Sequence, residues 1–150
     1  MGAIEKEYNL DNGGGLTYSL TAGETYYIEV EQYRGVGVYT LNIGPKKQIM
    51  DITNDMAVSD SIQYTAQEND YLYVAETDGV YRLQFSDVQE GNGLRLEVFN
   101  SGWEIIRQEY NFGNGDGMNL SLSKGERYFI RVAQHRGLSK YTLTVEPQQE

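Results

Sequence analysis

The sequence predicts an all-β protein, a jelly-roll-like antiparallel β-sandwich made of one complete unit and one repeated half-unit. Three observations predict this fold. Apolar and polar residues alternate in short runs, turns rich in glycine and asparagine separate the runs, and a long internal repeat is present. No window shows sustained helical periodicity.

The composition indicates a globular chain and excludes several classes of function. Of the 150 residues, 39% are hydrophobic and 23% are charged, which is enough for one core. The formal charge of −10 argues against nucleic acid and anionic membranes as partners. No apolar run approaches the roughly 20 residues of a membrane-spanning helix. Cysteine is absent, which excludes disulfides and thiolate chemistry. The first residues lack a signal-peptide pattern, which carries no weight against secretion.

The internal repeat is the strongest pattern in the chain. Residues 8–44 align with residues 110–146 without a gap, and 18 of the 37 positions are identical. Gly23 and its counterpart Gly125 mark a tight turn. In the run that follows, Tyr26, Ile28 and Val30 alternate with other residues in the period of two that is typical of a half-buried strand. The pattern predicts that each copy is a three-stranded unit with one apolar face.

The residues between the copies differ in sequence but also predict strands, separated by glycine-rich turns. These strands are expected at Tyr71–Ala75, Val80–Phe85, Leu94–Phe99 and Trp103–Ile106. Pro45 and Pro147 each fall just past a closing strand, where a boundary is expected. We therefore predict that residues 49–150 form a complete unit and that residues 1–48 are the second half of a preceding unit.

A half-unit with an exposed apolar face needs a partner. It could pack on residues 49–150, complete a neighbouring molecule in a dimer by exchange of the half-unit, or belong to a tandem array of repeats. The polar faces of the two copies differ in charge, since Thr25 and Glu29 correspond to Arg127 and Arg131. Opposite charges could guide docking of one copy beside the other. The alternative is sequence drift on two solvated surfaces, which contributes little energy.

The order of the strand patterns resembles that of the bacterial pre-peptidase C-terminal domain. The resemblance is carried by the runs that begin at Asp70 (DYLYV), Leu94 (LRLEVFN) and Leu122 (LSKGERYFIRV), and by the closing YTLTV at Tyr141. It covers about residues 60–147, and again residues 16–44. It implies a β-sandwich of about eight antiparallel strands appended to secreted and cell-surface proteins. It further implies a domain that is not catalytic, and some relatives bind collagen or polysaccharide, some with calcium.

Catalysis is not expected from the residues present. His135 is the only imidazole, and the repeat has Tyr33 at the matching position. A position that accepts both residues fits a turn or rim aromatic better than a catalytic base. A glycosidase with paired carboxylates stays formally open, because acidic residues abound, but a short sandwich offers little room for a cleft.

Calcium is the cofactor that the sequence leaves open; otherwise none is expected. Two loops combine Asn, Asp and Gly, at residues 11–15 and 114–117, and a third acidic segment enters the complete unit at residues 51–60. Calcium prefers such oxygen ligands, whereas hairpin turns use the same residues and an acidic segment is often only a solvated linker. The candidate ligands are Asp51, Asn54, Asp55, Asp60, Asn114 and Asp116.

Exposed aromatic residues are the other candidate site. Sugar-binding sandwiches stack sugar rings on the faces of Tyr or Trp side chains. Tyr27 falls on the face opposite Tyr26, Tyr33 follows at a turn, and Trp103 lies beside Gly102 on another hairpin. Tyr is also common in strands for ordinary packing, and a single Trp is often part of a core.

Together these patterns predict a non-catalytic accessory or spacer module of a secreted or cell-surface bacterial protein, which presents other domains or contacts neighbouring repeats. The alternative is a module that binds carbohydrate or collagen, with polysaccharide or an extracellular-matrix protein as its partner and calcium in a structural role.

Overall fold

A computed structural model describes residues 4–10, 14–45, 47–64 and 67–149. The chain divides into two compact units, Met1–Lys46 and Lys47–Glu150, and each is described by itself. The division lies close to the boundary expected from Pro45. None of the described residues lies in a helix, and the search for a membrane-spanning helix in this part of the chain found none.

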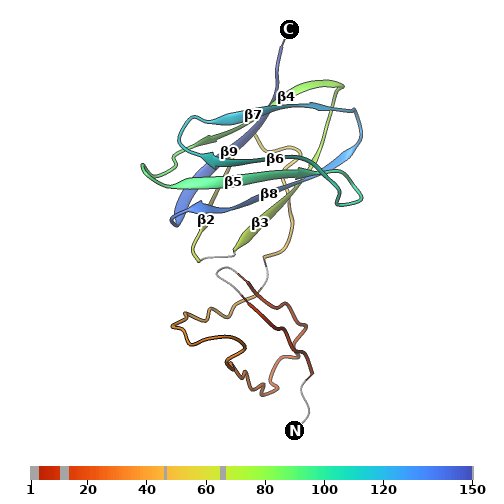
Figure 1. The fold of residues 1–150 in the computed structure, drawn as a ribbon. Coiled ribbons are helices and arrows are strands. Elements are labelled where there is room, and N and C mark those ends of the chain that lie inside the picture. Colours follow the sequence, from red (N-terminus) through yellow and green to blue (C-terminus); the bar gives the residue numbers. More distant parts are fainter. Residues whose placement is uncertain (1–3, 11–13, 46, 65–66, 150) are drawn as a thin grey trace. The chain divides into compact units, whose positions relative to one another are not determined.

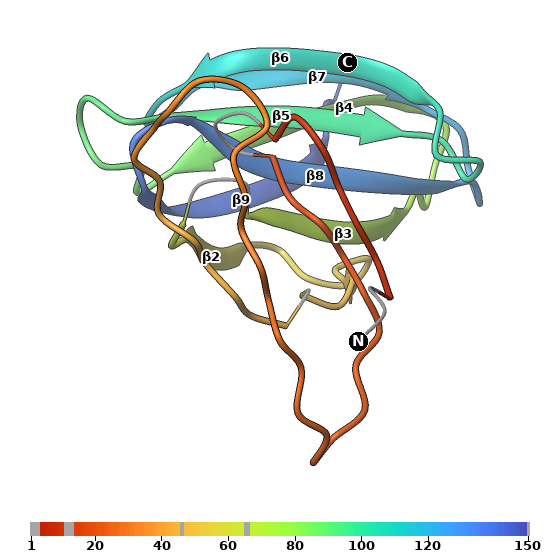
Figure 2. The same ribbon diagram turned by 60° about the horizontal axis from the view of Figure 1, so that its bottom comes forward.

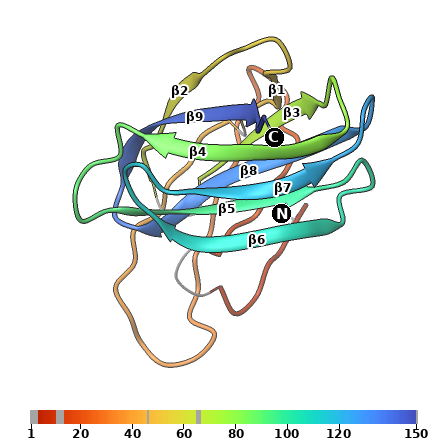
Figure 3. The same cartoon turned by 90° about the horizontal axis from the view of Figure 1, so that it is seen from above.

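The unit Lys47–Glu150 is a sandwich of two sheets (Figure 1). One sheet has the order β1-β3-β8-β5-β6. In Figure 2 its strands β6, β5, β8 and β3 follow one another from top to bottom. The other has the order β2-β9-β4-β7, with β9 and β4 side by side in Figure 3. The strands are β1 (Met50–Asp51), β2 (Val58–Ile62), β3 (Glu68–Val74), β4 (Gly79–Ser86), β5 (Gly93–Phe99), β6 (Ile105–Phe112), β7 (Gly117–Leu122), β8 (Arg127–Arg136) and β9 (Ser139–Pro147). The predicted all-β sandwich is confirmed.

The core lies between the two sheets and follows from the alternation of residues along each strand. In β8, Ile130 and Val132 are buried while Arg131 between them faces outward. The same period places Leu94, Leu96 and Val98 of β5 in the core. Aromatic rings fill the centre, where Phe85 makes edge contacts with Phe112 and Tyr141.

The strands expected in the middle of the chain are present as β3, β4 and β5. The fourth begins later than expected, because Trp103 lies in the preceding turn with φ at +60° and β6 starts at Ile105. Two strands were not expected. β2 begins at the end of the acidic segment 51–60 and runs on to Ile62. β1 pairs with β3 in parallel, whereas the other pairs are antiparallel.

The pairing order shows how the two halves of this unit depend on each other. β7 pairs with β4, β8 lies between β3 and β5, and β9 lies between β2 and β4. No two of β7, β8 and β9 are neighbours. The three strands of the second copy of the repeat therefore make all of their sheet pairings with strands from residues 58–99.

This order corrects the prediction that each copy of the repeat is a three-stranded unit. Residues 110–146 do supply three strands, β7, β8 and β9, but these do not pair with one another. In the first copy no described residue of 4–45 lies in a strand. Figure 1 accordingly draws this segment, in red to orange, without arrows. The physical reason is that the three segments of a copy do not pair with one another. Each needs a strand from the other half.

Candidate functional site

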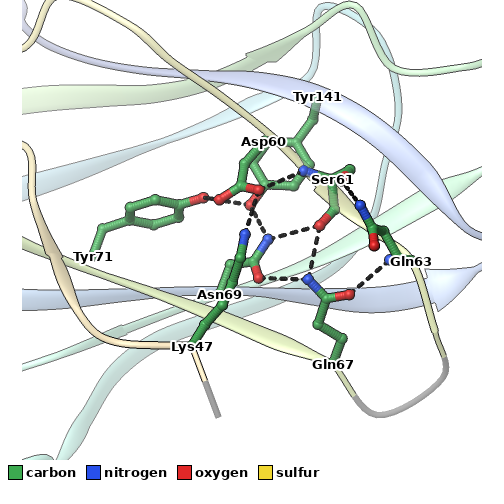
Figure 4. Close-up of polar contacts among 8 residues, drawn as sticks. All are labelled: Lys47, Asp60, Ser61, Gln63, Gln67, Asn69, Tyr71 and Tyr141. Atoms are coloured by element: carbon green, nitrogen blue, oxygen red, sulfur yellow. Dashed lines mark hydrogen bonds and ion pairs between the residues drawn. The ribbon is translucent and has the colours of Figure 1, made fainter. Parts of the chain in front are cut away.

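A buried polar cluster links the two sheets around Asp60 (Figure 4). The hydroxyl of Tyr71 in β3 donates to Asp60 Oδ2 at 2.9 Å, and the hydroxyls of Tyr71 and Tyr141 are 2.5 Å apart. Because the Tyr71 proton points to Asp60, the Tyr141 hydroxyl donates to Tyr71. Asn69 Nδ2 in turn donates to the Tyr141 hydroxyl at 2.7 Å. Lys47 Nζ completes the chain at 2.5 Å from Asp60 Oδ1.

The charges of this cluster are balanced within it. Burial raises the pKa of Asp60, but hydrogen bonds from Lys47, Ser61 and Tyr71 outweigh that effect, so the pKa lies below its ordinary value. Burial raises the pKa of both Tyr71 and Tyr141, which keeps the two phenols neutral. The cluster thus holds one ion pair and a chain of neutral donors, an arrangement that fixes the two sheets to each other.

The candidate calcium ligands do not lie together around a single point. The described residues contain no group of three or more His, Cys, Asp or Glu side chains arranged to hold a metal. Asp51 accepts a hydrogen bond from Thr53 N at 3.0 Å, which lowers the pKa of Asp51. Asp60 forms an ion pair with Lys47. Asn54 and Asp55 lie in the exposed turn after β1.

The second candidate loop is a turn between β6 and β7. Asp116 Oδ2 accepts a hydrogen bond from Gly113 N at 2.7 Å, and Asn114 is exposed beside it. This turn borders a shallow polar hollow that is also lined by Arg82 and Glu109. The remaining loop, at residues 11–15, includes 11–13 and so falls largely outside the described residues.

A second candidate site lies on the outer face of the five-stranded sheet, and we call it the Trp103 surface (Trp103, Phe99, Phe129, Arg131 and Asp70). The Trp103 ring stacks on Phe129 with centroids 4.1 Å apart and planes 7° apart. Arg131 lies under the rings of Phe99 and Trp103. Trp103 is 40% exposed, so it is neither a core residue nor a fully free one. One face of its ring packs on Phe129, and part of the ring stays in solvent.

An ion-pair network supports the Trp103 surface from below. Arg131 donates from Nε and a terminal nitrogen to the two carboxylate oxygens of Asp70, at 2.8 and 3.1 Å, and its Nε lies 3.0 Å from Glu68. The hydrogen bonds to Asp70 raise the pKa of Arg131, although burial opposes them. Glu97, which lies opposite Arg131 in β5, is buried beside Arg95. Two arginines, Arg131 and Arg95, thus lie among three acids.

The other predicted aromatic residues belong to the unit Met1–Lys46. Tyr27 and Tyr33 are both exposed, and Tyr33 contacts the ring of Tyr8 and the guanidinium of Arg34. His135 lies at the exposed end of β8 with its ring against Tyr110, which agrees with a rim position.

Sequence reasoning missed the polar cluster and the ion pairs of Arg131. Asn69 and Tyr141 are 72 residues apart, and no local pattern links them. The signal that was available for Arg131 was the change from Glu29 in the other copy, but its partner Asp70 could be identified only from the strand register.

Comparison with known proteins places the fold. No family model and no curated protein sequence matches the chain. The pre-peptidase C-terminal domain of a collagenase from Bacillus anthracis has a similar structure, with a TM-score of 0.56 at 16% identity, covering 70% of this chain and all of that domain. The Yersinia pseudotuberculosis-derived mitogen aligns over 63% of this chain and 86% of its own, at 12% identity and a TM-score of 0.48, which is too low to carry an inference. The resemblance seen in the sequence is therefore confirmed at the level of fold: this chain has a β-sandwich like that of a pre-peptidase C-terminal domain.

Proposed function

We propose that this chain is a non-catalytic accessory module of a secreted or cell-surface bacterial protein, and that residues 16–44 serve it as a segment that interacts with a neighbouring module. The similar fold of a collagenase-associated domain supports an accessory role.

The observation that carries the proposal is a reversal of burial between identical residues. Ile28 is 59% exposed, whereas its counterpart Ile130 is 2% exposed; Leu41 and Leu143 differ in the same way, at 51% and 1%. The apolar residues that form the core in residues 110–146 are thus exposed to solvent in residues 8–44. Exposed apolar surface of this extent is typical of an interaction site.

Hydrogen exchange on the full chain tests the proposal. The amides of β8 and β9 should exchange slowly, because each of these strands is paired on both sides, and so should the amides of β7 that bond to β4. Those of residues 16–44 should exchange at nearly the rate of an unfolded chain. Protection of residues 16–44 comparable to that of β7–β9 would show that the segment is already satisfied, and the proposed function would then be wrong.

The second candidate function is binding of polysaccharide or collagen at the Trp103 surface. The stacked and partly exposed Trp103 favours it, because a sugar ring or a proline can lie on such a face. The test is retention of the full chain on insoluble polysaccharides and on collagen, with calcium and with chelator. The matched variants are Trp103→Ala, which removes the platform, and Tyr27→Ala, which removes an exposed aromatic residue from the other unit.

Retention that is lost only in Trp103→Ala would support the second function. Loss of retention with chelator would support a role for calcium in binding. Absence of retention on every matrix would leave the inter-module role as the better account.

A further inference from the structure

We infer that residues 16–44 are the second half of a divided sandwich whose missing first half carries a basic residue at the position that Asp70 occupies in this chain. The inference rests on the proposed function and names the chemistry of the partner. The occupant is a half-sandwich patterned like residues 58–99 but opposite in charge at that point.

The first step is that residues 16–44 already hold the turns of the complete unit. Gly23 and Gly125 have φ of +84° and +79°, and Gly35 and Gly137 have φ of +61° and +62°. The same side-chain bond recurs beside the first turn. Tyr26 accepts from Thr21 N at 3.0 Å, and the counterpart Tyr128 accepts from Ser123 N at 2.9 Å.

The second step is that these segments lack only their pairing partners. In the complete unit, β8 forms hydrogen bonds with β3 on one side and β5 on the other, and β9 with β2 and β4. All four partners come from residues 58–99. Residues 25–34 and 37–45, which align with β8 and β9, therefore require four strands of that kind, and pairing would bury the apolar residues that are now exposed.

The third step is that residues 58–99 of this sequence are the wrong partner. The register places Arg131 directly between Asp70 and Glu97, whose relative exposures are 6% and 5%. In residues 16–44 the same position is Glu29. Docking that segment on residues 58–99 would place a third carboxylate against Asp70 and Glu97. Arg95 would remain paired with Glu97, and no arginine would be left to pair with Asp70.

The charge of Glu29 thus disfavours pairing of residues 16–44 with a second copy of this chain. It favours pairing with a half-sandwich that has Lys or Arg opposite Glu29. Like charges that meet in a desolvated contact cost several kcal/mol, which is how related interfaces exclude wrong partners. This reasoning disfavours a dimer by exchange of the half-unit and favours complementation by a different segment.

The experiment supplies the missing half directly. An additional copy of residues 47–109 is placed immediately before Tyr8, which restores the spacing of the complete unit. One protein carries the added segment unchanged, a second carries Asp70→Arg in the added segment, and a third combines the unchanged segment with Glu29→Arg. Glu24→Arg, at an exposed turn, gives the matched control for the change of charge.

Hydrogen exchange of residues 16–44 is the readout. The second and third proteins should protect this segment at least about tenfold more than the first, because each restores an oppositely charged pair. The Glu24→Arg control should resemble the first protein. Equal protection in all of the proteins would refute the charge rule, and lack of protection in all would refute complementation. Both results differ from failure of the proposed function, in which residues 16–44 are protected before any segment is added.

Discussion

Replacing Tyr71 by Phe tests whether the polar cluster around Asp60 holds the two sheets together. Tyr71 is 1% exposed and belongs to β3, whereas Asp60 belongs to β2 and Tyr141 to β9, both in the opposite sheet. The substitution keeps the ring and its packing. It removes only the hydroxyl, which donates to Asp60 at 2.9 Å and lies 2.5 Å from the Tyr141 hydroxyl.

The expected cost follows from these two bonds. A hydrogen bond to a charged group contributes about 1.5–3 kcal/mol, and one between neutral groups about 0.5–1.5 kcal/mol. Tyr71→Phe should therefore lower the free energy of unfolding by about 2–4 kcal/mol. Tyr141→Phe should cost about 2 kcal/mol, since its hydroxyl makes two neutral bonds and Asn69 retains Ser61 O as a second acceptor.

The assay is urea unfolding of the full chain, followed by Trp103 fluorescence, for both single variants and the double variant. Because the two hydroxyls share one bond, the double variant should lose about 1 kcal/mol less than the sum of the single losses. A loss below about 0.5 kcal/mol for Tyr71→Phe, or strict additivity, would refute the view that this cluster joins the sheets.

Two further predictions concern the same unit. The partners of Asp60 lower its pKa, so its contribution to stability is present above the ordinary carboxylate pKa of about 4 and is lost as the pH falls through the pKa of the folded state. Lys47→Met removes one of these partners and should shift the midpoint of acid unfolding to higher pH. An unchanged midpoint would contradict this account. Gly137→Ala should cost about 1–3 kcal/mol, because φ is +62° and a Cβ, 2.2 Å from Asn92 Oδ1, would displace the Asn92 side chain from its hydrogen bond to Leu138 O. Gly35→Ala is strained by a similar φ, but Gly35 lies in the unit Met1–Lys46, so the substitution should leave the urea transition of the unit Lys47–Glu150 within about 0.5 kcal/mol of the parent.

The sequence predicted the sandwich because its signals are local. Alternation in the run from Tyr128 to Val132 indicates a strand with one buried face, and Gly125 marks the turn before it, whatever the rest of the chain does. The boundary expected near Pro45 rests on the same kind of local signal. In these cases a few adjacent residues determine the structure.

The pairing of the strands could not be predicted in this way. The order of the two sheets depends on contacts between residues far apart, such as Asp70 and Arg131, which are 61 residues apart. The prediction that the three segments of a copy form a unit by themselves was wrong. Alternation shows that a strand has a buried face, but it does not show which strand lies beside it. The calcium prediction, which stays a prediction, relied on clustering along the sequence, and that clustering could not indicate the ion pair between Asp60 and Lys47.

The two acids that replace Arg131 and Ala133 in the first copy, Glu29 and Glu31, have a consequence for solubility. The run Tyr26-Tyr-Ile-Glu-Val alternates apolar residues without a partner strand, a pattern that promotes aggregation between identical chains. In-register stacking of such chains would bring each Glu29 against another Glu29 and each Glu31 against another Glu31. We expect these two acids to act as gatekeepers that disfavour such stacking of identical chains.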